Sequence, residues 1–198
     1  MPITLQTLKE LLAAPHEAIT KVAKSRNINE AIVMLTMNWL LVSVAFSLYT
    51  GNYSLIPAIL VAGIIGTLFV DFLLHMGLTI VGGKGDFTSI LTASTYPFFG
   101  LALSFLIVSA FFSWSEVVAV VIGTILFILY FTVAFTGMFR LIKETYKLDI
   151  ITIWIVTSLV LLAALASVYL LSAFYILKSG AILTSLQSLG SIPPYPPS

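Results

Sequence analysis

The stretch LIPAILVAGIIGTLFVDFLLHMGLTIVGGKGD (residues 55–86) decides the class of fold. Residues 55–81 form a nearly continuous apolar run, and a helix needs about 20 such residues to cross the hydrocarbon layer of a membrane. Because backbone groups find no water partners in lipid, a run without alternation predicts a helix. The whole chain has this character: 60% of its 198 residues are hydrophobic and 9% are charged, compared with roughly 25% charged in a soluble domain. The sequence therefore predicts an integral membrane protein.

Four further apolar runs have the length of a membrane span. They cover residues 31–49, 89–112, 117–139 and 150–177. We therefore predict an all-α fold, a bundle of five transmembrane helices, in which Pro97 kinks the third span or marks its true start. The predicted organisation is an amphipathic helical segment over residues 1–27, a five-span domain over residues 28–177 and an external proline-rich tail over residues 178–198.

The basic residues predict the orientation, because they accumulate on the cytoplasmic side of membrane proteins. An odd number of spans places all but Lys178 of the nine basic residues on one side, namely Lys9, Lys21, Lys24, Arg26, Lys84, Arg140, Lys143 and Lys147. This predicts a multi-pass protein of the cell membrane with a cytoplasmic N-terminus and an external C-terminus. Contacts with lipid headgroups are expected at Lys21, Lys24, Arg26, Arg140, Lys143 and Lys147.

The segment before the first span has an apolar face backed by lysines. Residues 3–23 are predicted to form a helix that is broken at Pro15, because proline disrupts a helix interior. Such a helix suits the surface of an anionic membrane. The alternative is a helix packed beneath the bundle.

The glycine-rich connection after residue 81 looks at first like a phosphate-binding loop. That motif reads G-x-x-x-x-G-K-[ST] and lies between a strand and a helix. Here the residue five positions before Gly83 is Leu78, and the residue after Lys84 is Gly85. Nucleotide binding is therefore not expected. The glycines instead let the chain reverse between two spans, and Asp86 is expected to cap the next helix.

Polar residues recur every four positions along the second span, at Gly63, Thr67, Asp71, His75 and Thr79. Positions with this spacing share one helix face. An acid within a span is costly and usually faces the bundle interior, so we expect an intramembrane polar pair of Asp71 and His75, with Asn38 of the first span at a similar depth. Two interpretations are open: a proton or cation relay, or structural hydrogen bonds between helices.

Several motifs occur in a characteristic order. They are LLAAPHEAITKVA (residues 11–23), His75, the run Gly82, Gly83, Lys84 and Gly85 followed by Phe87, and Tyr96-Pro97. In this order the chain resembles the Yip-domain family, Ypt/Rab-interacting membrane proteins and their prokaryotic relatives, from about residue 8 to residue 177. The resemblance implies five spans, a family turn at the glycines and an adaptor role, in Golgi or ER membranes if the source is eukaryotic.

The chain departs from the eukaryotic members of that family. Those members are associated with Rab GTPases and vesicle formation. The long cytosolic region with its Asp-Leu-Tyr-Gly-Pro signature is missing here. The chain thus resembles the short archaeal or bacterial members, and Rab binding does not carry over.

Three classes of function are compatible with the sequence. The first is a non-enzymatic membrane-organising or protein-interaction adaptor, which would use the N-terminal helix, loop 82–87 and loop 140–149 and bind lipid, an unidentified protein or a second copy of itself. The second is a small transporter or channel subunit that works through Asp71 and His75.

The third class, a membrane enzyme, needs clustered acids, histidines or an activated nucleophile. The two histidines, His16 and His75, lie far apart in the sequence, and the chain has no cysteine. We therefore expect no catalytic residues, no metal site and no cofactor. The net charge of +1 also argues against a nucleic-acid partner.

Overall fold

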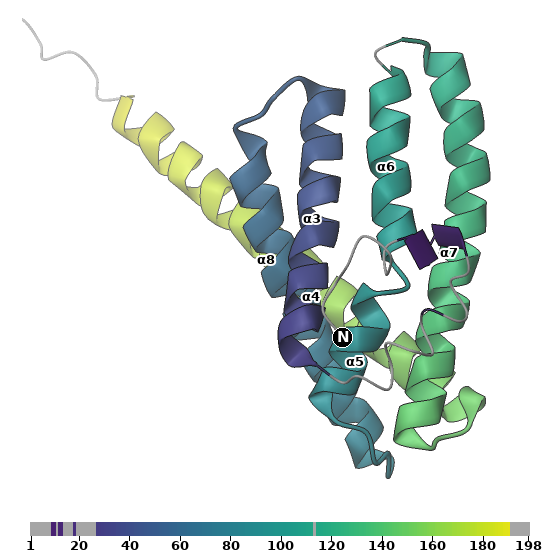
Figure 1. The fold of residues 1–198 in the computed structure, drawn as a ribbon. Helices are drawn as coiled ribbons and strands as arrows, with labels where there is room; N and C mark the ends of the chain where they lie inside the picture. The colour runs from purple at the N-terminus through teal and green to yellow at the C-terminus, as the bar shows by residue number, and fades with distance from the viewer. Residues whose placement is uncertain (1–8, 11, 14–17, 19–26, 113, 191–198) are drawn as a thin grey trace, which may run out of the picture. The chain divides into compact units, whose positions relative to one another are not determined.

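The computed structural model describes residues 9–10, 12–13, 18, 27–112 and 114–190, and these residues are helical apart from short connections (Figure 1). The chain divides into two compact units, Met1–Thr157 and Ser158–Ser198. The bundle and its side-chain clusters belong to the first unit. The predicted helix break at Pro15 and residues 191–198 of the predicted tail lie outside the described residues.

The prediction of an all-α fold with five candidate spans is confirmed. The long helices of the described residues are α3 (Ile28–Thr50), α4 (Leu55–Ile80), α5 (Phe87–Thr95), α6 (Phe99–Phe112), α7 (Glu116–Tyr146) and α8 (Ile150–Gly190). Five segments are long and apolar enough to cross a membrane, namely α3, α4, α5 with α6, α7 and the part of α8 over Ile150–Leu170.

Two helices run further than the sequence predicted. α7 continues beyond Phe139 to Tyr146, and α8 continues beyond residue 177 to Gly190. Residues 178–190 are therefore helical, which corrects the prediction that the proline-rich tail begins at residue 178. Neither extension contains a proline, so every residue in it can donate its backbone N–H to the helix.

Three helix boundaries have clear local causes. α5 ends at Thr95 and α6 begins at Phe99, as expected around Pro97, whose ring occupies the place of a backbone N–H. Asp86 caps α5, since its Oδ1 accepts the Ser89 amide at 2.8 Å. α4 ends in a Schellman motif: the amides of Gly82 and Gly83 bond to the carbonyls of residues 79 and 78 at 3.0 and 2.9 Å.

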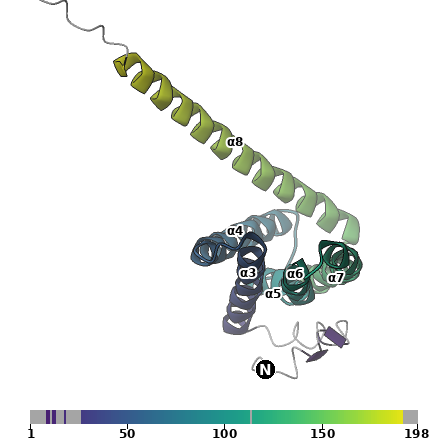
Figure 2. The same cartoon turned by 90° about the horizontal axis from the view of Figure 1, so that it is seen from above.

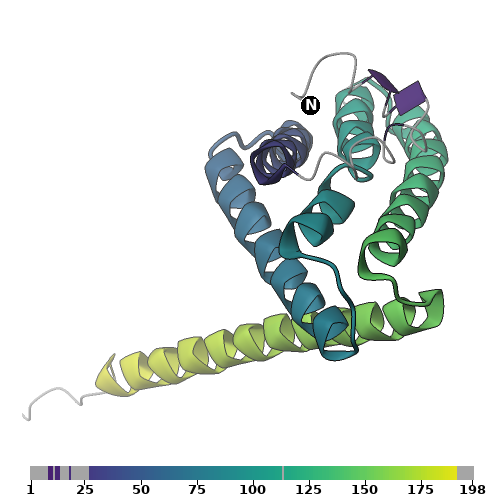
Figure 3. The same cartoon turned by 60° about the horizontal axis from the view of Figure 1, so that its bottom comes forward.

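The helices of the first unit pack in an order that differs from their order in the chain. α3 contacts both α4 and α6, α6 contacts α7, and α5 contacts α3, α4 and α7. Seen from above, α4, α3, α6 and α7 follow one another along an arc (Figure 2). Figure 3 shows α5 between α4 and α7. The kinked third span therefore brings its short first half to the centre of the bundle, where most α5 side chains are buried.

Candidate functional site

Tyr146, the last residue of α7, is the buried centre of a cluster of contacts. The residue is fully buried, and its hydroxyl lies 2.5 Å from Nδ1 of His75 on α4. The hydroxyl also donates to the carbonyl of Asp86 at 3.0 Å, and the Tyr146 carbonyl accepts the Lys84 amide at 3.1 Å. One residue thus joins the ends of α4 and α7 to the start of α5. We call His75, residues 82–86 and Tyr146 the Tyr146 cluster.

Two glycines of the cluster make room for the tyrosine ring. A Cβ atom on Gly83 would lie 2.6 Å from the Tyr146 ring, and one on Gly85 would lie 2.3 Å from it. Of the loop glycines, Gly82 alone has a positive φ, +94°. The sequence attributed chain reversal to all three glycines, whereas the structure assigns the turn to Gly82 and close packing to the other two.

The Tyr146 hydroxyl lies within hydrogen-bond distance of two groups, Nδ1 of His75 and the carbonyl of Asp86. A tyrosine hydroxyl carries one proton, and Tyr146 donates it to the carbonyl of Asp86. Nδ1 of His75 donates to the Tyr146 oxygen in the tautomer that carries a proton on Nδ1, and accepts from it in the other tautomer. The carbonyl of Asp86 can only accept a hydrogen bond. The Tyr146 cluster therefore joins α4, α7 and the loop before α5 through hydrogen bonds.

Asp71 has a different partner from His75. Its carboxylate is buried, at 3% exposure, and Oδ2 accepts the Ser94 hydroxyl of α5 at 2.6 Å. Asn38 of α3 donates from Nδ2 to the carbonyl of Thr95 at 2.7 Å. The two side chains reach consecutive residues of α5, consistent with their predicted equal depth. Among the described residues, however, no hydrogen bond joins Asp71 to His75 or to Asn38. Of the expected pair, Asp71 bonds to Ser94 of α5, and His75 bonds to Tyr146 of α7.

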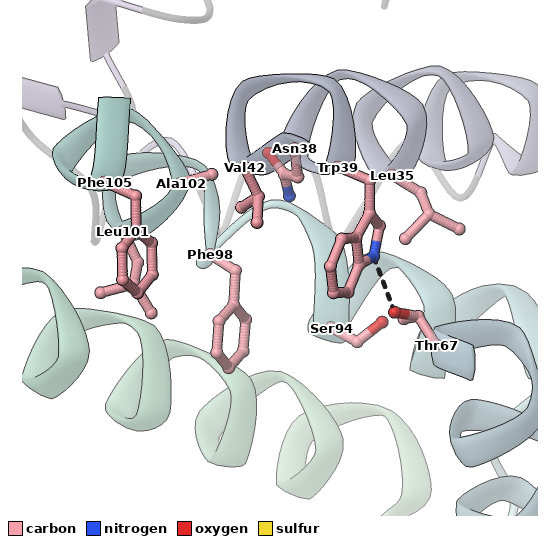
Figure 4. Close-up of a pocket in the computed structure, with 10 residues that line it drawn as sticks. All are labelled: Leu35, Asn38, Trp39, Val42, Thr67, Ser94, Phe98, Leu101, Ala102 and Phe105. Atoms are coloured by element: carbon pink, nitrogen blue, oxygen red, sulfur yellow. Dashed lines mark hydrogen bonds between the residues drawn. The ribbon is translucent and has the colours of Figure 1, made fainter. Parts of the chain in front are cut away.

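A cavity of about 470 Å³ lies beside these hydrogen bonds, between α3 and α6 with one residue each from α4 and α5 (Figure 4). Trp39 of α3 closes one side and donates from Nε1 to Thr67 at 2.9 Å. Ser94 and Asn38 also line the cavity, and both donate to partners in the protein. The remaining lining side chains are apolar, and Oδ1 of Asn38 is buried without a hydrogen-bond partner among the described residues.

The cations predicted to contact lipid fall into two groups. Arg140, Lys143 and Lys147 are exposed, and the Nε of Arg140 bonds to Glu144 at 3.0 Å. Lys84 of the glycine loop, which was not among these predicted contacts, is exposed as well. These residues belong to the glycine-loop end of the first unit. Lys21, Lys24 and Arg26 lie outside the described residues. Where the chain is described, no group of three or more His, Asp or Glu side chains could hold a metal ion.

The fold and the clusters define a class: a helical protein with five candidate membrane spans, held together by hydrogen bonds between spans. Comparison with protein-family models, with curated proteins and with solved structures finds no match. The resemblance to the Yip-domain family therefore rests on the residues of this chain alone.

Sequence reasoning missed Tyr146 and Ser94. The sequence predicts that the fourth span ends at Phe139, which puts Tyr146 in a loop, whereas α7 continues to Tyr146. A signal was present, since Met138, Ile142 and Tyr146 recur every four residues and all three are buried, which is the spacing of one helix face. Ser94 had no comparable signal, because serine is common in apolar spans and its partner is remote in sequence.

Proposed function

We propose that this protein is a non-enzymatic membrane adaptor, or membrane-organising protein, that presents a rigid polar face at the glycine-loop end of its bundle. The observation that carries the proposal is the Tyr146 cluster. It fixes loop 82–86 against the end of α7, so that two loops distant in sequence form one surface. A rigid surface binds a partner without a large loss of conformational entropy.

Both signs of charge are present on this face. Lys84, Lys143 and Lys147 are exposed, and so are Glu144 and Asp149. Hydrogen bonds from the Thr152 hydroxyl and amide lower the pKa of Asp149 below its usual value, so this carboxyl is ionised at neutral pH. Charges of both signs at fixed positions suit recognition of a polar protein surface, where electrostatic complementarity provides specificity.

The transporter alternative receives less support from the geometry. A relay needs titratable groups that exchange protons or ions. Asp71 bonds to a serine hydroxyl, and the chain from His75 through Tyr146 ends at a carbonyl. The adaptor proposal is also the one that the Yip-type resemblance implies, with the motif His75, residues 82–85 and Phe87 serving to organise the face.

Site-specific photo-crosslinking in the native membrane tests the adaptor role. A photoreactive residue at Lys84 or Lys147 is expected to capture the same partner protein. Tyr53, which is 61% exposed in the connection between α3 and α4, is the matched control and is expected to give no such product. Identical products at all three positions, or none at any of them, would contradict the proposal.

Cysteine labelling tests the orientation, with the proposed face in the cytoplasm. The chain has no cysteine, so each introduced thiol is the sole target. We expect a membrane-impermeant maleimide to label Tyr53→Cys in intact cells, and to label Lys84→Cys and Lys147→Cys only after lysis. Labelling of Lys84→Cys in intact cells would show that the orientation is reversed.

A further inference from the structure

A second cavity, of about 380 Å³, lies near the end of α7 against the first turns of α8. Phe135, Phe139, Ile150 and Trp154 form its apolar part, and Arg140 and Lys143 lie at its polar part. All of these residues belong to the first unit of the chain. The cavity therefore combines hydrocarbon-like walls with two cations at the end of a membrane span.

The apolar walls are ordered by aromatic packing. The rings of Phe139 and Trp154 are stacked, with centroids 4.8 Å apart and planes 6° apart, and the ring of Phe135 lies 6.1 Å from that of Phe139. Trp154 is 53% exposed, so its ring is accessible from outside the protein. Tryptophan is favoured at the membrane interface, so an exposed ring near the start of a candidate span suits contact with lipid.

The two cations lie on the same side of α7. Arg140 and Lys143 are three residues apart, a spacing that places side chains next to each other on a helix. Glu144 holds the guanidinium through Nε at 3.0 Å. Glu144 thus orients the guanidinium, whose planar fork of five N–H donors has the geometry that suits a phosphate.

We propose that this cavity binds one anionic phospholipid, with the headgroup phosphate on Arg140 and Lys143 and an acyl chain along Phe135, Phe139 and Trp154. Basic pockets next to transmembrane helices favour such headgroups. Arg140 and Lys143 line the cavity, whereas Lys147, which was also expected to contact headgroups, does not. The site goes beyond the adaptor face and does not depend on a protein partner.

The test uses full-length protein in phosphatidylcholine nanodiscs that contain a minor fraction of lipid with brominated acyl chains. Bromine quenches tryptophan at short range, and the signal of Trp154 is the difference between the wild type and Trp154→Phe. We expect brominated phosphatidylglycerol to quench this signal at a mole fraction at least about fivefold lower than brominated phosphatidylcholine does. Fivefold is about the preference for an anionic headgroup that one nearby cation provides. High salt should reduce the preference.

The variants separate a built site from general surface charge. The preference should vanish in Arg140→Ala/Lys143→Ala and persist in Lys147→Ala, which removes an exposed cation of the same end. If the double variant does not fold, the single variant Lys143→Gln is used instead, because Lys143 is exposed. This variant should lose part of the preference for phosphatidylglycerol. Equal quenching by the two lipids in the wild type, an equal loss in Lys147→Ala, or full displacement by soluble glycerophosphate would each overturn the proposal.

Discussion

Gly85→Ala is expected to lower the stability of the protein by about 1–3 kcal/mol, the usual cost of forcing extra atoms into a packed core. The added methyl group would lie 2.3 Å from the Tyr146 ring. That ring has little room to move, because it is fully buried and its hydroxyl holds both His75 and Asp86. Thermal unfolding of the purified protein in detergent measures the effect.

Gly66→Ala is the matched control for this change. A Cβ atom at Gly66 would meet nothing within 4 Å, and the residue lies inside α4. Alanine is favoured over glycine in a helix by roughly 0.5–1 kcal/mol, so this variant should be unchanged or slightly more stable. A destabilisation of Gly66→Ala equal to that of Gly85→Ala would show that contact with Tyr146 is not the cause.

A double variant tests the same contact from the other side. Tyr146→Ala removes the ring and is itself destabilising, because it leaves a cavity and breaks the cluster. With the ring absent, Gly85→Ala should cost little more, so the two effects should fall well short of additive. Strict additivity would mean that Gly85 and Tyr146 do not interact.

Asp71→Asn is expected to retain most of the stability, whereas Asp71→Leu is expected to lose more. The asparagine carbonyl can accept the Ser94 hydroxyl, and hydrogen bonds between membrane helices contribute on average about 0.6 kcal/mol and at most about 1.7. Leucine removes the acceptor and adds volume at a position that is 3% exposed, which typically costs about 1–3 kcal/mol. Thermal stability of both variants in the same detergent gives the comparison.

Ser94→Ala and a flux measurement complete the test. The Ser94 hydroxyl also bonds to the carbonyl of Leu91 at 3.2 Å. When Asp71 is replaced, this hydroxyl therefore still has an acceptor. When Ser94 is replaced, the Asp71 carboxyl loses its hydroxyl donor. Ser94→Ala should therefore destabilise more than Asp71→Asn. In proteoliposomes none of these variants should alter proton flux. Strong flux in the wild type that disappears in Asp71→Asn, with stability unchanged, would instead establish the relay.

The sequence alone determined the features that depend on local chemistry. A run of apolar residues such as 55–81 must form a helix in lipid, because its backbone groups find partners only in the helix itself. The break at Pro97 and the cap at Asp86 are equally local, since one residue lacks an N–H and the other supplies a nearby acceptor. These effects involve residues within a few positions of each other and can be read directly from the sequence.

The tertiary structure alone decided which polar groups meet. His75 and Asp71 share a helix face one turn apart, yet one bonds to Tyr146 and the other to Ser94. The helix order α4, α3, α6, α7 and the insertion of α5 bring these partners together across 71 and 23 residues of sequence. A periodic pattern fixes which face of a helix is polar, but the rotation and neighbours of that helix arise from packing side chains of the whole bundle.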